Sequence, residues 1–305
     1  DQPLADQALA PLHAVSRLAR EHVTVAVGGE GADELFGGYL THCASLLARS
    51  VRRLPRWTLA LARKAAARWP VSDEKIGFEY KLQRFLEGCA MHPARAHVYW
   101  NGTFTGSEKR SLLRSPLPGA LAGTLKDLVA AGDHLAAYLW FDQAYFLPDD
   151  ILTKVDRISM AHALEVRPPF LDHRIVEFAA SLPNDLRIRG SRQKVILKDL
   201  MRDKLPAVVL TRKKTGLDIP AHQWLRGLLR PLFRDTLESA STRYSDFFRF
   251  AEIERYARAH ESRRANLGYH LWGLLTLFLW MKRWSIETAP VTEPARTAEK
   301  VFGST

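Results

Sequence analysis

A glycine-rich turn with three carboxylates follows the clearest strand pattern in the sequence. Residues Val23–Val27 are rich in β-branched side chains and are bounded by glycine, which predicts a buried β-strand. The turn after them reads Gly28-Gly29-Glu30-Gly31-Ala32-Asp33-Glu34, and a helix is expected next. Glycines allow a tight turn and let a ligand approach the backbone, and amides at a helix N-terminus attract anions.

The acidic side chains of this turn, Glu30, Asp33 and Glu34, indicate two kinds of chemistry. A carboxylate repels phosphate, so it holds a phosphate group only through a cation such as Mg²⁺. An ionised carboxylate can also act as a base that removes a proton. The pattern therefore favours a nucleotide–metal site or a proton-transfer site. The alternative is a structural turn whose acids stabilise the helix N-terminus.

Most of the remaining sequence predicts helices. Apolar spacing, capping residues and prolines place them at residues 11–21, 46–69 with an interruption near Pro55, 72–92, 133–145, 151–164, 172–181 with Asp172 as its cap, and 193–205. Leu147–Asp150 predicts a turn between two of these helices. The apolar stretch Leu267–Met281 is too short to span a bilayer comfortably and contains His270, so it predicts a buried helix. The expected fold class is α/β, predominantly helical, with one clear strand and an incomplete sheet.

Charge and cysteine content narrow the class of protein. The chain has 44 Lys and Arg against 33 Asp and Glu, which permits nucleic acid, an anionic membrane surface or a phosphate-bearing small molecule as partner. Ten basic and two acidic residues lie between Arg187 and Lys214, but the aromatic–basic interleaving of nucleic-acid recognition motifs is missing. We therefore expect neither nucleic acid nor a membrane as partner. Two distant cysteines, Cys43 and Cys89, and no visible signal peptide predict a cytoplasmic location.

The glycine-rich turn is also the first of three long blocks that carry a family resemblance. The blocks are GGEGADELFGGY, Leu147–Pro183 and Gly190–Gly227. The first resembles the S-G-E/D-G-x-D-E-L/V-F-x-G-Y signature of the asparagine synthetase family, in its C-terminal synthetase domain. The others are similar to that domain's helical core and to its substrate-closing loop. The resemblance implies an adenine-nucleotide α-hydrolase-like fold, the PP-loop ATP pyrophosphatase type, with a parallel sheet and a large helical region.

The resemblance also implies a reaction and roles for particular residues. With ATP and Mg²⁺, a carboxylate such as that of aspartate is adenylated, and ammonia or an amine then displaces AMP to form an amide. Glu30 matches the acid that helps deprotonate the ammonia, and Asp33 matches the acid that helps hold Mg²⁺–pyrophosphate. Lys194 matches the loop lysine that neutralises charge on the phosphates. Asp150 falls near an acid beside the substrate, with Asp149 as the alternative register.

The remaining expected site residues bind ATP and pyrophosphate. They are Gly28, Gly29 and Gly31 in the turn and Lys154, which aligns with a basic residue of the same pocket. Gly28 stands where the family favours serine, so a hydroxyl that reaches phosphate is lost. Lys194 also has a structural alternative, an ordinary surface lysine.

The sequence departs from the family pattern in two respects. It shows neither the leading cysteine nucleophile of a glutaminase domain nor the S-G-G-x-D-S loop that binds ATP phosphates. We therefore predict a partial synthetase domain at residues 1–286, a poorly ordered tail at 287–305, and a second chain that supplies the missing parts. Alternatives are a non-catalytic remnant or partner-binding subunit, and a family member that closes β-lactams, cyclises lasso peptides or amidates sugars.

Overall fold

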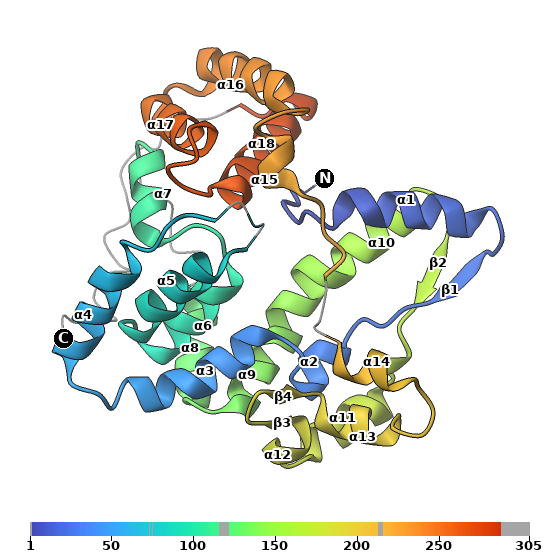
Figure 1. Ribbon diagram of the computed structural model, residues 1–305. Helices are drawn as coiled ribbons and strands as arrows, with labels where there is room; N and C mark the ends of the chain where they lie inside the picture. Colours follow the sequence, from blue (N-terminus) through green and yellow to red (C-terminus); the bar gives the residue numbers. More distant parts are fainter. Residues whose placement is uncertain (1, 73, 75, 116–121, 213–215, 288–305) are drawn as a thin grey trace. The chain divides into compact units, whose positions relative to one another are not determined.

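The predicted strand forms the first half of a small parallel sheet in the computed structural model. The structure describes residues 2–72, 74, 76–115, 122–212 and 216–287. Strand β1 (Val25–Val27) pairs in parallel with β2 (Glu165–Arg167), and the amide of Gly28 extends the ladder by donating to the Arg167 carbonyl at 2.9 Å. Together with the many helices, this pairing confirms a predominantly helical α/β fold with a parallel sheet (Figure 1).

The chain divides into two units. Unit 1 comprises residues 1–5, 56–130 and 220–305, and unit 2 comprises residues 6–55 and 131–219. Every residue that the sequence assigns to the candidate site lies in unit 2. We describe each unit by itself.

Unit 2 surrounds the sheet and the glycine-rich turn with short helices. Besides β1 and β2 its elements are α1 (Leu9–Arg20), α2 (Ala32–Phe36), α3 (Leu40–Val51), α9 (Leu135–Phe141), the π-helix η1 (Asp142–Leu152), α10 (Thr153–Met160), the 3₁₀ turn η2 (Pro169–Leu171), α11 (His173–Ser181), α12 (Asn184–Arg187), β3 (Ile188–Arg189), β4 (Arg192–Gln193), α13 (Val195–Leu200) and α14 (Ala207–Thr211). Helix α1 packs along α10, next to the sheet (Figure 1). Buried Leu35, Phe36 and Ala179 pack with Ile196 and Leu197, so one apolar cluster joins α2, α11 and α13.

Unit 1 is helical in its described residues. Its elements are α4 (Arg56–Ala66), α5 (Phe78–Cys89), α6 (Pro93–Asn101), α7 (Gly106–Leu112), α8 (Ala122–Ala131), α15 (Ala221–Trp224), α16 (Arg230–Tyr244), α17 (Phe250–Glu261) and α18 (Gly268–Arg283). The predicted buried helix is confirmed as α18, whose Leu271 and Phe278 lie in the main core with Ile253 of α17. No helix among the described residues is long and apolar enough to cross a bilayer.

Several predicted boundaries are confirmed and others are wrong. The interruption near Pro55 separates α3 from α4, and the Asp172 carboxylate caps α11 by accepting from the Arg174 amide at 3.0 Å. The helix predicted at 193–205 is shorter, because α13 ends at Leu200 and turns follow. Apart from Glu287, the predicted tail lies outside the described residues.

The turn predicted at Leu147–Asp150 is absent, because these residues belong to η1, which joins α9 to α10 without a break. Leu147 is buried, and the Thr153 hydroxyl donates to the Pro148 carbonyl at 2.7 Å. Burial of this apolar side chain outweighs the local tendency of the Pro-Asp-Asp sequence to turn.

The strand β1 is more exposed than predicted. Val25 and Val27 are 39% and 77% exposed. Ala26, between the two valines, is partly buried, so Val25 and Val27 share a face of the strand that is uncovered among the described residues. The β-branched composition that predicted a strand does not determine how much of it is buried.

Buried His260 of unit 1 is expected to make the stability of the protein depend on pH. Its Nε2–H donates to the His222 carbonyl at 2.9 Å and its Nδ1 accepts from the Leu267 amide at 3.1 Å, so the neutral ring is fully hydrogen-bonded. Burial, with the nearby charge of Arg226, lowers the pKa of His260 to about 4. Because the unfolded chain binds this proton near pH 6.5, stability should fall as the pH drops from 6.5 to 4.

Urea unfolding across this pH range measures the effect against His260→Gln. As the pH drops from 6.5 to 4, the unfolding free energy of the parent chain should fall more steeply than that of the variant. The difference in slope should correspond to about one proton per molecule. Parallel pH curves for the two proteins would contradict the assigned burial.

Candidate functional site

Gly31 determines the shape of the glycine-rich turn between β1 and α2, and any other residue at this position would be strained. Gly31 caps the N-terminus of α2 with φ = +88°, in the left-handed region. A β-carbon at Gly31 would lie 2.3 Å from the Leu171 Cδ2 atom, so the turn is also in close contact with η2. The sequence Gly28–Glu34 therefore forms a tight turn fixed by packing as well as by backbone geometry.

Asp33 and Lys194 form the central ion pair of the site. The Lys194 ammonium lies 2.7 Å from Asp33 Oδ1, and the two side chains are 26% and 21% exposed. Gly38 makes this approach possible, because a β-carbon there would lie 1.7 Å from Asp33 Oδ1 and 2.3 Å from Lys194 Cε. The structure thus brings together two of the residues expected to handle Mg²⁺ and phosphate, although they are far apart in sequence.

The backbone of Lys194 also has an unusual conformation. It lies at φ = +52° and ψ = +45° at the N-terminus of α13, a left-handed conformation that costs a non-glycine residue about 1–2 kcal/mol. The apolar cluster that joins α13 to α2 holds the segment in place. Such strain persists only where packing enforces it and is typical of functional sites.

The Glu30 carboxylate turns back over the end of β1. Its Oε2 atom is buried and finds no hydrogen-bond partner among the described residues. A β-carbon at Gly28 would lie 1.9 Å from this atom. A buried, unpartnered carboxylate oxygen is costly, and in native proteins such an atom usually marks a functional group or a missing ligand.

Glu34 differs from the other two acids of the turn. It is 1% exposed, the Tyr39 hydroxyl donates to its carboxylate, and the Gln143 side chain donates to its backbone carbonyl at 3.2 Å. Burial raises the pKa of Glu34, although the Tyr39 hydrogen bond opposes the shift. Glu34 is therefore a structural residue that ties α2 to Tyr39 and η1.

Asp150 and Lys154 belong to a second charged cluster, which includes Asp6. The buried Lys154 ammonium forms an ion pair with the Asp6 carboxylate, whose other oxygen accepts from the Ala8 amide at 2.8 Å. Burial raises the pKa of Asp150, with Lys154 opposing the shift and Asp6 adding to it. Asp149, the alternative register, is exposed. Asp6 is not among the residues predicted from the sequence, because it lies outside the three blocks that resemble the family.

Sequence comparisons identify the family of the chain. A family profile described as "Asparagine synthase" matches residues 1–284. The chain belongs to the asparagine synthase family. It is 29% identical over 285 residues to asparagine synthetase (glutamine-hydrolysing) 1 of Bacillus subtilis, covering 92% of the chain and 44% of that protein.

Two further relatives match shorter parts of the chain. Asparagine synthetase (glutamine-hydrolysing) 3 of Bacillus subtilis is 27% identical over 199 residues, covering 65% of the chain and 27% of that protein. The amidase chry2 of Gibberella zeae is 26% identical over 259 residues, covering 76% of the chain and 38% of that protein. The chain therefore spans less than half the length of these relatives.

The glycine-rich turn carries side chains that could bind a magnesium ion. Mg²⁺ prefers carboxylate oxygens and the oxygens of a bound phosphate. Asp33 presents a partly exposed carboxylate, and Glu30 has an oxygen without a protein partner. The donor set therefore fits Mg²⁺ held jointly with a phosphate, and Asp33 is the residue that would hold it.

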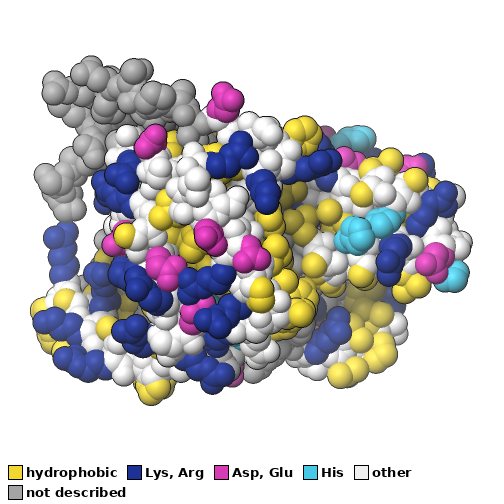
Figure 2. All heavy atoms as spheres, turned by 90° about the horizontal axis from the view of Figure 1, so that it is seen from above, with side chains coloured by type: hydrophobic (Ala, Val, Ile, Leu, Met, Phe, Trp, Pro, Cys, Tyr) yellow, Lys and Arg dark blue, Asp and Glu magenta, His cyan; other side chains and the backbone are white. Residues whose placement is uncertain are grey.

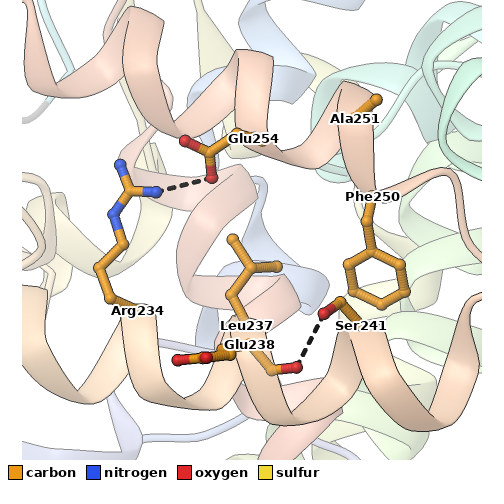
Figure 3. Close-up of a pocket in the computed structure, with 7 residues that line it drawn as sticks. All are labelled: Arg234, Leu237, Glu238, Ser241, Phe250, Ala251 and Glu254. Carbon is orange, nitrogen blue, oxygen red and sulfur yellow. Dashed lines mark hydrogen bonds and ion pairs between the residues drawn. The ribbon is translucent and has the colours of Figure 1, made fainter.

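A surface pocket in unit 1 differs from the site around the glycine-rich turn, because its basic side chain is paired with two acids. It lies between α16 and α17 of unit 1, where Arg234 forms an ion pair with Glu254 at 2.6 Å and Ser241 donates to the Glu238 carbonyl at 2.8 Å (Figure 3). Arg234 also pairs with Glu261 at 2.8 Å. Because Arg234 is already paired with acids, the pocket offers a phosphate group little net positive charge.

Basic side chains are not gathered into a single band on the face shown in Figure 2, where they alternate with acidic and hydrophobic ones. Arg230, Arg234 and Arg255 all form ion pairs with glutamates of α17. These arginines of unit 1 therefore contribute little unpaired positive charge.

Proposed function

We propose that this chain is the synthetase part of an ATP-dependent, amide-forming enzyme. The observation that carries the proposal is the Asp33–Lys194 pair, set beside a turn in which Glu30 has an unpartnered oxygen. Membership of the asparagine synthase family supports it. The substrates would be ATP and a small carboxylate, aspartate or an analogue, in the cytoplasm.

In the first step the substrate carboxylate attacks the α-phosphorus of ATP, and the bond to pyrophosphate breaks. Negative charge grows on the leaving pyrophosphate, so positive charge at a fixed position lowers the barrier. Lys194 would supply one such charge, and the backbone amides of Gly29 and Gly31 in the glycine-rich turn would donate to a phosphate. Mg²⁺, when held by Asp33, would supply the rest of the positive charge.

In the second step an amine nitrogen attacks the adenylated carboxyl group. The new C–N bond forms, the C–O bond to AMP breaks, and the nitrogen must lose a proton. Glu30 would accept this proton, because it carries a carboxylate in the turn close to Asp33 and an ionised carboxylate can act as a base. Asp150 would lie beside the substrate, and Lys154, which is paired with Asp6, would belong to the part of the site that binds ATP and pyrophosphate.

The amine source and the phosphate-binding S-G-G-x-D-S loop would come from a glutaminase domain and a further segment or chain. This proposal rests on the family resemblance and on the chain's covering less than half of its relatives. A family member that closes β-lactams, cyclises lasso peptides or amidates sugars would use the same two steps with another carboxylate.

ATP–pyrophosphate exchange with aspartate tests the proposal. It should be measured for the chain alone and for mixtures with candidate partner chains, with circular dichroism confirming folding. We expect ATP–pyrophosphate exchange that depends on the carboxylate, either for the chain alone or for at least one mixture. Folded protein that shows no exchange in every mixture would contradict it.

One observation favours a second candidate, a non-catalytic subunit that binds a partner. Among the described residues β1 pairs with β2 alone, so its other edge has no strand partner, and such edges pair readily with another chain. Isothermal titration with Mg²⁺–ATP distinguishes the two functions, because tight nucleotide binding by the folded chain would argue against the non-catalytic one.

A further inference from the structure

Helix α4 of unit 1 carries large apolar side chains on its outward face. Trp57 and Leu61 lie one turn apart and are 68% and 62% exposed. The opposite face holds the helix in place, because α4 packs on α5, Ala66 is buried, and the Ala66 carbonyl accepts from the Gln83 side chain at 3.0 Å (Figure 1). Neither Trp57 nor Leu61 is therefore needed to anchor α4.

Two basic side chains continue the same face of α4. Leu61, Lys64 and Arg68 follow Trp57 at the spacing of a single helix face, and we call these four residues the α4 stripe. Arg68 lies in the turn directly after α4, where its guanidinium donates to the Lys64 carbonyl at 3.3 Å, and both side chains are exposed. Residues 56–72 contain four basic and no acidic residues, so no acid within the segment offsets this charge.

A pair of exposed aromatic rings follows the α4 stripe. Trp69 comes directly after Arg68, and its ring contacts that of Phe78 edge to face, with the centroids 5.6 Å apart. More than half of each of these two side chains is exposed. Single exposed hydrophobic residues are common on proteins, but several large ones at one short helix mark an interaction site.

We propose that the α4 stripe docks on an anionic lipid surface, with α4 lying in the plane of the bilayer interface and not crossing it. Tryptophan and leucine of such a helix enter the boundary between headgroups and acyl chains, where tryptophan is enriched. Lysine and arginine turn their long side chains toward the headgroups and are attracted by the negative charge of the lipids. A protein partner fits less well, because protein interfaces are depleted of lysine.

This proposal differs from the expectation drawn from the sequence, which does not show that Trp57 and Leu61 are exposed. It is also independent of the proposed function, since none of the candidate site residues lies in α4.

Flotation with lipid vesicles tests the proposal on the chain itself. The protein is mixed at low salt with vesicles of phosphatidylcholine alone, or of equal parts of phosphatidylcholine and phosphatidylglycerol. It should float with the acidic vesicles and much less with the neutral ones, and added salt should weaken binding because exposed charges are screened. Folded protein that stays in the buffer with acidic vesicles at low salt would overturn the proposal.

Two double variants locate the binding on α4. Trp57→Ala with Leu61→Ala removes the apolar part of the stripe and should lower the partition coefficient about 10-fold or more. Lys64→Gln with Arg68→Gln removes two charges at the lipid surface and should lower it about 20-fold. All four side chains are exposed, so the variants should fold like the parent. Undiminished binding by both variants would show that another surface contacts the lipid.

Matched changes elsewhere in unit 1 are the controls. Trp284→Ala with Leu228→Ala removes the same two types of side chain from exposed positions, and Lys109→Gln with Arg243→Gln removes two exposed charges. Both should bind within about two-fold of the parent, because salt screens charges that lie away from the contact. An equal loss in the two charge variants would overturn the proposal, since the attraction would then come from the net charge of the chain.

Sedimentation velocity of the same proteins distinguishes a lipid surface from a protein partner. A parent chain that does not float but forms dimers, and loses them in Trp57→Ala with Leu61→Ala, would overturn the proposal. The α4 stripe would then be assigned to contact with a second copy of this chain.

Discussion

Lys194→Ala should reduce ATP–pyrophosphate exchange by about 100-fold or more. Removal of one preorganised group that stabilises transition-state charge typically costs 10²- to 10³-fold, and Lys194 is the cation paired with Asp33 at 2.7 Å. The strained backbone of Lys194 and the glycine opposite it hold the ammonium at a defined position. The rate of ATP–pyrophosphate exchange is measured at saturating ATP and aspartate, so that a loss reflects slower adenylation and not weaker substrate binding.

Two control variants separate charge from structure in this experiment. Lys194→Gly removes the same ammonium but adopts φ = +52° at lower cost, so equal losses in the alanine and glycine variants would assign the effect to the missing charge. Lys204→Ala removes an exposed lysine from the same basic segment and should leave exchange within about two-fold. A comparable loss in Lys204→Ala would show that the basic segment acts through its overall charge.

The sequence alone predicts the local part of this site well. A β-branched segment followed by glycines predicts β1 and the turn, because strand and turn preferences depend on near neighbours. The pairing of Asp33 with Lys194 depends on the apolar cluster that joins α2 and α13, so no local pattern reveals it. It was expected only because the two blocks resemble one family.

The residues that sequence reasoning misjudged all depend on tertiary contacts. Glu34 follows Asp33 directly, yet one helical step of about 100° separates their side chains, and Glu34 points to Tyr39 in the interior. Asp6 meets Lys154 across nearly half the chain. Pro148 lies inside a π-helix, a rare element that is frequent at functional sites and that residue propensities do not predict.

Glu30→Gln should abolish most amide formation and leave adenylation largely intact. General-base catalysis contributes about 10²- to 10⁴-fold, and glutamine has nearly the same shape but cannot take up the proton. Because Glu30 lies in a fitted space over Gly28, the isosteric change should keep the turn folded. Amide formation and exchange are measured on the same preparation. Glu165→Gln, an exposed acid on β2, serves as the control and should change neither rate.

The choice of nucleophile separates a proton-accepting role of Glu30 from a binding role. Ammonia is mainly protonated at neutral pH and needs a base before it attacks, whereas hydroxylamine is mainly neutral and does not. Glu30→Gln should therefore retain hydroxamate formation from hydroxylamine while losing the reaction with ammonium. Equal loss with both nucleophiles would mean that Glu30 holds the amine or the adenylate in place. In that case the unpartnered Oε2 would be a binding atom, and the base would have to be sought among the other carboxylates of unit 2, beginning with Asp150, whose pKa burial already raises.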